Sequence, residues 1–158
     1  MPVSYSNIDF IAHDRDGHVL LLAEAKSRRG TSASWAAGLR RNMLSHGMLP
    51  ASKYFLVATP ERLYLWRQED SHAAEALPQV TIDAEKVLAP YFKVLRQDPS
   101  QIGPEAFEHL VLAWLKDLAR PELSGADQNA RQGDGSLLWL AELSRSLQAA
   151  EVELTARS

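Results

Sequence analysis

The chain of 158 residues contains no cysteine, and it has no long uninterrupted apolar segment. The absence of cysteine excludes a disulfide framework and a cysteine-based zinc site, and it fits a reducing compartment. No apolar run approaches the roughly 18 residues that a membrane-spanning helix needs. The first residues also lack a basic segment followed by an apolar one, so no signal peptide is expected. We therefore expect a cytoplasmic protein without a membrane partner.

The remaining composition is that of an ordinary globular protein, with 46% hydrophobic and 23% charged residues. The length is suited to one domain with a substantial core. We expect a single domain over residues 1–158. It should comprise an α/β core at 3–67 and a helical C-terminal annex at 81–155.

The formal net charge of -3 hides an uneven distribution along the chain. Residues 1–67 contain nine Lys and Arg against five Asp and Glu, whereas residues 68–158 contain eight against fifteen. This balance excludes a globally basic nucleic-acid-binding protein. It leaves room for a basic face on the N-terminal half.

Two apolar segments within residues 3–26 are joined by Asp16-Gly17, which predicts a β-hairpin because glycine tolerates the positive φ of a tight turn. Pairing outward from this turn places Asp9 directly opposite Glu24. Side chains alternate along a strand, so Glu24 and Lys26 share a face, and Asp9 joins them as the partner of Glu24. Two carboxylates and an amine are costly to bury at the end of an apolar hairpin. A divalent metal ion would explain them.

The rest of the chain alternates between helical and extended patterns. The N-terminal part predicts a helix at 33–46 and strands at 54–58 and 63–66. Its order is therefore strand-strand-helix-strand-strand. After a polar connector at 68–80, three helices are predicted, at 83–95, from Pro104 onward and at 137–153.

An Asp on one strand and Glu-x-Lys on its antiparallel neighbour, followed by a helix and a further strand, resembles the PD-(D/E)XK nuclease superfamily over residues 3–67. The resemblance implies a restriction-endonuclease-like fold, in which helices flank a mixed sheet, and metal-dependent hydrolysis of nucleic acid. It implies Asp9, Glu24 and Lys26 as the catalytic residues. It also implies Mg²⁺ or Mn²⁺ held by Asp9, Glu24 and the backbone carbonyl of Ala25. Residues 23–30 are also similar to the core of small bacterial proteins of unassigned function.

The chemistry of these residues suits such a reaction. Hard oxygen ligands select Mg²⁺ or Mn²⁺, and the bound ion lowers the pKa of a water molecule and contacts the phosphate. Lys26 would position that water or stabilise the attacked phosphate. Four nearby basic residues are candidates for contacts with flanking phosphates of DNA, which is favoured over RNA: Arg28, Arg29, Arg40 and Arg41.

Other interpretations remain open. The Glu24–Lys26 pair could also be a surface ion pair at a strand end, which contributes little stability, but this leaves the facing like charges of Asp9 and Glu24 unexplained. The family's proline before the Asp is Ile8 here, and its first helix, which often supplies a glutamate, has no counterpart ahead of the hairpin. Glu105 or Glu108 from a C-terminal helix could supply that carboxylate, or both could simply face solvent. The alternative function is a catalytically inactive nuclease-like module for nucleic-acid binding or protein assembly, with a homodimer as one form.

Overall fold

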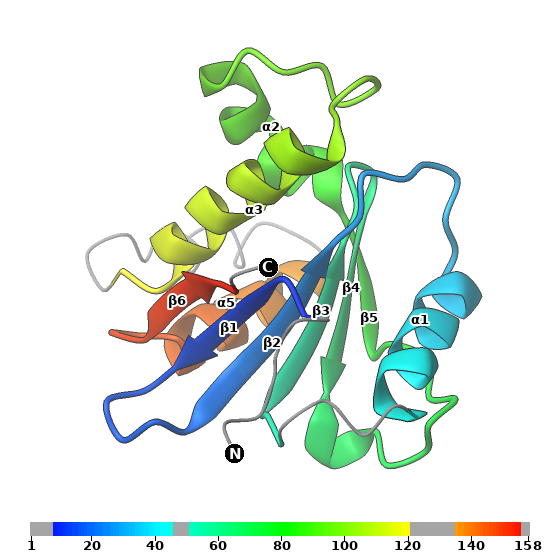
Figure 1. The fold of residues 1–158 in the computed structure, drawn as a ribbon, viewed down its shortest axis with the longest axis vertical. Helices are drawn as coiled ribbons and strands as arrows, with labels where there is room; N and C mark the ends of the chain where they lie inside the picture. Colours follow the sequence, from blue (N-terminus) through cyan, green and yellow to red (C-terminus); the bar gives the residue numbers. More distant parts are fainter. Residues whose placement is uncertain (1–7, 46–50, 121–134, 156–158) are drawn as a thin grey trace.

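A computed structural model describes residues 8–45, 51–120 and 135–155, apart from the side chains of 135–137. The chain forms an α/β fold in which a six-stranded mixed sheet lies between two layers of helices (Figure 1). None of the described helices has the length and apolar character that crossing a bilayer requires.

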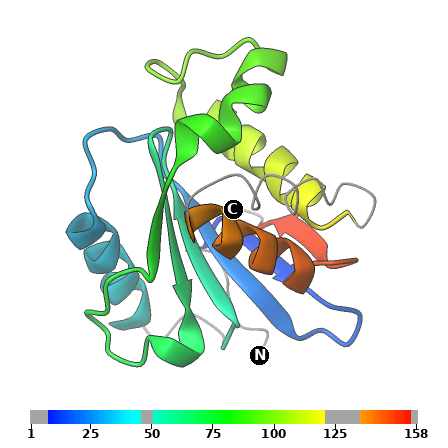
Figure 2. The same cartoon turned by 180° about the vertical axis from the view of Figure 1, so that it is seen from behind.

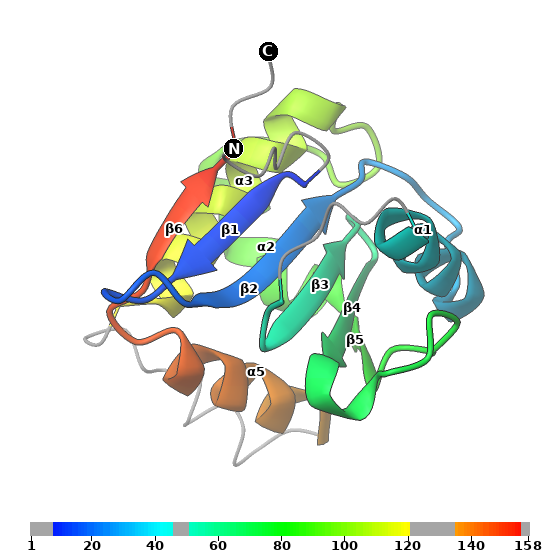
Figure 3. The same ribbon diagram turned by 60° about the horizontal axis from the view of Figure 1, so that its bottom comes forward.

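The strands follow the order β5-β4-β3-β2-β1-β6 across the sheet. They are β1 (Phe10–His13), β2 (Val19–Ala25), β3 (Tyr54–Ala58), β4 (Arg62–Arg67), β5 (Val80–Asp83) and β6 (Glu151–Leu154). Strands β2 and β3 are parallel, and every other neighbouring pair is antiparallel. Figure 3 shows β6 beside β1 at one edge of the sheet, so the two ends of the described chain meet there.

Four helices of the described chain cover the two faces of this sheet. They are α1 (Ala33–Ser45), α2 (Ala84–Val94), α3 (Pro104–Leu118) and α5 (Gly135–Ser146). Helix α1 connects β2 to the parallel β3 and packs on one face, whereas α2, α3 and α5 pack on the opposite face (Figures 1 and 2). A short 3₁₀ turn, Gln68–Asp70, follows β4.

The central strand β3 is buried along its whole length, as its continuous apolar sequence predicts for a strand covered on both faces. Its alternate side chains enter two separate cores. Phe55 packs edge-on against Trp66 beneath α1, with ring centroids 5.6 Å apart. Leu56 faces the other way, into the core that α2, α3 and α5 cover.

The predicted hairpin is present, with two irregularities that compensate each other. The turn is one residue longer than predicted, because Asp14 N–H donates to the His18 carbonyl at 3.0 Å and Gly17 adopts a φ of 84°. A bulge between Ala12 and His13 then restores the predicted register, with Ala12 opposite Leu21. The residues nearest the candidate site are therefore paired as the sequence indicates, although the turn itself differs.

The C-terminal half is not purely helical, in contrast to the annex predicted at 81–155. Strands β5 and β6 add to the two opposite edges of the sheet. The prediction of a helix at 137–153 is wrong at its end, because α5 stops at Ser146 and a left-handed Ala149, with φ 63°, turns the chain into β6. The helices predicted at 83–95 and from Pro104 are confirmed as α2 and α3.

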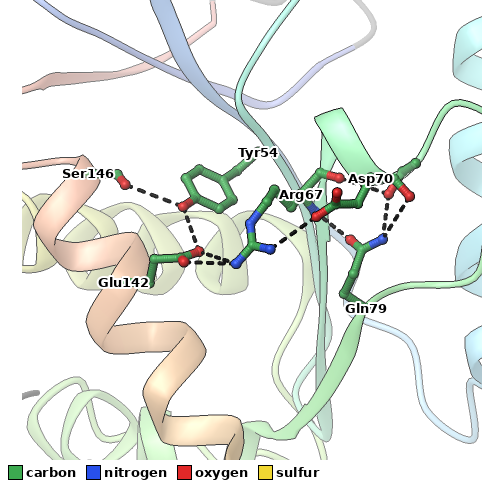
Figure 4. A network of polar contacts seen from close by, with 7 residues as sticks. Tyr54, Arg67, Asp70, Gln79, Glu142 and Ser146 are labelled. Carbon is green, nitrogen blue, oxygen red and sulfur yellow. Dashed lines mark hydrogen bonds and ion pairs between the residues drawn. The ribbon is translucent and has the colours of Figure 1, made fainter.

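A polar network fixes α5 to the sheet (Figure 4). Arg67, at the end of β4, donates two hydrogen bonds to the Glu142 carboxylate, at 2.8 and 2.9 Å. Tyr54 donates its hydroxyl to the same carboxylate at 2.7 Å, and the Arg67 guanidinium lies 4.5 Å from the ring centroid of Trp139. Hydrogen bonding to Arg67 holds the pKa of Glu142 below its ordinary value. Glu142 is thus ionised and anchored at neutral pH.

Candidate functional site

The carboxylates of Asp9 and Glu24 each accept a hydrogen bond from a main-chain N–H of the opposite segment, just before β1 begins. The Asp9 N–H donates to Glu24 Oε1 at 2.8 Å, and the Asp9 Oδ2 accepts the N–H of Ala25 at 2.9 Å. These reciprocal bonds place the two carboxylates side by side across the β1–β2 ladder. The adjacency that the sequence predicts for Asp9 and Glu24 is therefore confirmed, although Asp9 lies at a bend just before β1.

Both carboxylates are buried. Asp9 is 0% exposed and Glu24 is 2% exposed. Glu24 therefore does not belong to a surface ion pair, which was the simplest explanation of the Glu-x-Lys triplet. Two adjacent acidic groups in the interior are expensive, because each loses its hydration and each repels the other.

The electrostatics of Glu24 reflect this position. Burial raises the pKa of Glu24 to about 7, the nearby Lys26 ammonium opposes the rise, and the Glu108 carboxylate adds to it. Lys26 Nζ lies 3.2 Å from Glu24 Oε2, and its side chain is 40% exposed. The site thus consists of a buried acidic pair with an amine that reaches solvent.

Helix α3 brings a third carboxylate toward this pair. The Glu108 carboxylate makes the smallest of the contributions to the shifted pKa of Glu24, and the Glu108 side chain is half-buried. Glu105, one turn earlier on the same helix, is exposed. Of the two acids that the sequence offers on this helix, Glu108 is the half-buried one, and it raises the pKa of Glu24.

The loop after β2 is fixed on both sides. The Lys26 N–H donates to the Ala58 carbonyl at 2.9 Å, and the Gly30 N–H donates to Glu61 Oε1 at 2.8 Å. The Ser27 hydroxyl donates to the Ile102 carbonyl just before α3. The ends of β2 and β3 and the start of α3 therefore meet around Lys26. The part of Glu61 in holding this loop has no signal in the local sequence, because its partner lies 31 residues away.

Three of the four predicted phosphate-binding arginines are exposed, and the fourth is not. Arg28 and Arg29 lie directly after the site, with Arg28 stacked 5.8 Å from the Trp35 ring centroid, and Arg41 lies further along α1. Arg40 is only 2% exposed. Its guanidinium donates to the Ser71 carbonyl at 2.7 Å and to Gln68 Oε1 at 3.0 Å. This burial corrects the expectation for Arg40, whose donors bind the segment after β4.

In the described part of the chain, two groups of three His, Asp or Glu residues bring their ligand atoms close enough together to hold a metal ion. One comprises His13, Glu151 and Glu153 on β1 and β6, and the other comprises Asp14, Asp16 and His18 at the hairpin turn. The turn group is explained by backbone geometry, since Asp14 Oδ1 accepts the N–H groups of Asp16 and His18, both at 2.9 Å. The first group forms ion pairs, with His13 Nε2 3.6 Å from Glu153. Neither group includes Asp9 or Glu24.

The donor set at Asp9 and Glu24 fits a hard divalent cation. Carboxylate oxygens are the ligands that Mg²⁺ and Mn²⁺ prefer, and Lys26 Nζ already lies 3.2 Å from Glu24 Oε2. Comparison of the chain with protein-family models, with curated proteins and with solved structures finds no match.

Proposed function

We propose that this chain hydrolyses phosphodiester bonds in nucleic acid, with DNA preferred to RNA, and that it requires Mg²⁺ or Mn²⁺. The observation that carries the proposal is the buried, side-by-side placement of Asp9 and Glu24 next to Lys26. Burial of two acids lowers stability unless a cation offsets it, and strongly shifted pKa values gather at functional sites.

Each residue of the site has a distinct role in this proposal. Asp9, Glu24 and the Ala25 carbonyl hold the ion, which when bound lowers the pKa of a water molecule and neutralises charge on the phosphate. Lys26 is held beside Glu24 and extends to solvent, so its ammonium can contact a phosphate oxygen as negative charge builds up there. Glu108 is the third carboxylate.

We also propose that the sheet is restriction-endonuclease-like and that α3 takes the place of the first helix expected from the resemblance. Two features support this assignment. Strand β6, which follows α3 and α5 in the chain, pairs antiparallel with β1. Helix α3 packs against both β6 and β2, and it carries Glu108 toward Glu24. The chain would thus supply from its C-terminal half what the family supplies from its N-terminal end.

The nucleic-acid surface in this proposal lies around the loop after β2. Arg28 and Arg29 follow Lys26 directly and are exposed, and Arg41 adds a third exposed guanidinium on α1. Arg40 is not included, because its donors are buried. Guanidinium groups beside a phosphodiester site would bind flanking phosphates without regard to base sequence.

The test is incubation of the purified chain with plasmid DNA, single-stranded DNA and RNA in the presence of Mg²⁺ or Mn²⁺. Cleavage should be lost in EDTA and in Asp9→Asn and Lys26→Ala. It should persist in the matched control Lys116→Ala, which removes an exposed lysine at the far end of α3. Cleavage that persists in both site variants refutes the proposal, since a contaminating nuclease then explains it.

The second candidate is a nuclease-like module that binds nucleic acid or a protein without cleaving. Val94 and Leu95, neighbours at the end of α2, are 79% and 43% exposed, and a protein contact would cover such an apolar pair. Salt-dependent DNA binding by a wild type that never cleaves favours this function. Light scattering distinguishes a monomer from a homodimer.

A further inference from the structure

Asp9 is held from a third direction by the C-terminal end of the described chain. The Thr155 N–H donates to the Asp9 carbonyl at 2.8 Å, which extends the β1–β6 ladder by one residue. The Thr155 hydroxyl donates to the Ile8 carbonyl, and the Asp9 carbonyl oxygen lies 3.3 Å from the same hydroxyl. One side chain thus contacts two consecutive carbonyls at the residue that carries the buried acid.

The backbone at these carbonyls departs from a regular strand. Side chains two apart along a strand share a face, so Ile8 should lie with Phe10. Instead Ile8 packs in the core beneath α1, together with Ile11, whereas Phe10 packs in the opposite core. The chain therefore changes its alternation at Asp9, where the structure has a bend. At this bend the Asp9 carboxylate points toward β2, where it accepts the Ala25 N–H.

We infer that Thr155 is a positioning residue for Asp9: its hydroxyl holds the Ile8–Asp9 bend that directs the Asp9 carboxylate to β2 and to the ion site of the proposed function. The inference deepens that function, on which the role of the ion rests. It makes the end of β6 part of the support of a site formed near residue 9. The other contacts of β6 stabilise the strand, whereas Thr155 contacts the backbone carbonyls of Ile8 and Asp9 directly.

Loss of the Thr155 hydroxyl should change the orientation of the Asp9 carboxylate. Asp9 is then fixed by three independent bonds: its N–H to Glu24, its carboxylate to Ala25 N–H, and its carbonyl to Thr155 N–H. Without the hydroxyl, the bend can relax toward regular strand alternation. The carboxylate would then leave Ala25, and the two acids would no longer present oxygens to one cation. Partners that orient metal ligands change metal affinity by about 10–100-fold when removed.

The experiment compares Thr155→Val with Thr155→Ser. Valine has the shape of threonine and keeps the main-chain bond to Asp9 but lacks the hydroxyl, whereas serine keeps the hydroxyl. The matched control is Thr81→Val, an exposed threonine on β5 at the opposite edge of the sheet. Two quantities are measured on each full-length protein: hydrogen exchange of the Ala25 amide in EDTA, and Mn²⁺ affinity by isothermal titration.

The inference predicts faster exchange of the Ala25 amide in Thr155→Val, with the Ala23 amide unchanged, and Mn²⁺ affinity weakened about tenfold or more. Thr155→Ser and Thr81→Val should match the wild type. If Ala25 exchange and Mn²⁺ affinity are both unchanged in Thr155→Val, the inference is overturned. If Ala25 loses protection but the wild type binds no Mn²⁺, the positioning role is supported and the proposed function fails.

Discussion

The main-chain N–H of Asp9 is bound by the carboxylate of Glu24 at 2.8 Å, so one buried acid forms part of the support of the other. This relationship connects stability with charge at the site. Any proton or cation that changes the charge of Glu24 acts directly on the residue that orients Asp9. The pH dependence of folding should therefore report on this pair.

Glu24→Gln should flatten the pH dependence of stability. Burial raises the pKa of Glu24 from 4.5 to about 7, so the folded state holds this proton more tightly than the unfolded state. The contribution of Glu24 to the free energy of unfolding is thus largest below pH 4.5. It decreases by about 3 kcal/mol in total as the pH rises from 4.5 through about 7. Glutamine cannot ionise. Urea denaturation in EDTA at pH 5 and pH 8 measures the free energy of unfolding of both proteins.

The expected outcome is that the stability of the wild type, relative to Glu24→Gln, decreases between pH 5 and pH 8. Glu69→Gln, at an exposed acid in the 3₁₀ turn, serves as the control and should show no such change. A difference between wild type and Glu24→Gln that is the same at both pH values would contradict the shifted pKa.

Mn²⁺ should stabilise the wild type through the acidic site. At a concentration 100 times the dissociation constant, a ligand that binds only the folded state adds about 2.7 kcal/mol to the free energy of unfolding. Asp9→Asn should abolish this stabilisation, and Glu108→Gln should weaken Mn²⁺ binding by about tenfold. Thermal unfolding with and without Mn²⁺ measures both effects.

Glu105→Gln is the matched control for Glu108, because it removes an exposed carboxylate from the same helix one turn away. It should bind Mn²⁺ as the wild type does. Equal effects of the two substitutions would show that Glu108 is not a ligand of the ion and that both acids act only through their negative charge.

The pairing of Asp9 with Glu24 could be predicted from the sequence because it depends on local rules. Asp16-Gly17 marks the turn, and alternation along apolar strands fixes which residues are opposite. The longer turn and the bulge before His13 have opposite effects on register, so the residues beyond them pair as predicted. The predicted pairing of Asp9 with Glu24 is therefore correct even though the predicted turn is not.

The contributions of distant segments could not be predicted in the same way. The hydroxyl of Thr155 meets the carbonyl of Ile8 across 147 positions, and no local pattern encodes such a contact. Arg40 carries the charge of a phosphate-binding residue, but its burial depends on how the segment after β4 folds over α1. Strand β6 is only four residues long, and its alternating acids also fit the end of an exposed helix.

Arg40→Met should lower the stability of the fold, whereas Arg29→Ala should affect DNA binding. Arg40→Met leaves buried acceptors such as the Ser71 carbonyl without their donor, so it should lower the free energy of unfolding by about 3 kcal/mol. Arg29 is exposed, so Arg29→Ala should change stability by less than about 0.5 kcal/mol. Arg29→Ala should instead reduce the salt dependence of DNA binding by about one phosphate contact. Urea denaturation and binding at several salt concentrations measure the two effects.

Glu142→Gln should destabilise the fold without affecting the ion site. It removes the charge that receives two hydrogen bonds from Arg67, and because the pair is partly exposed the loss should be about 1–2 kcal/mol (Figure 4). Asp70→Asn, at the more exposed partner of the same arginine, should cost less. Tyr54 and Arg67 lie at the opposite end of β3 from Ala58, so Mn²⁺ affinity should be unchanged in both variants.

His13 should titrate above its ordinary pKa of 6.5 in the folded protein. The hydrogen bond to the Asp14 carbonyl raises the pKa of His13 most, and the carboxylates of Glu153 and Glu151 on β6 raise it further, against the opposing effect of burial. Its contribution to stability is therefore complete below pH 6.5 and is lost as pH rises through the higher folded-state pKa. Glu153→Gln should lower the His13 pKa, as measured by NMR titration of the imidazole, whereas Glu85→Gln on α2 should leave it unchanged. A His13 titration midpoint at or below pH 6.5 in the wild type would show that β6 does not hold the imidazole as a cation. Strand β6 would then be attached to β1 by the main-chain ladder, by Val152 in the core and by Thr155.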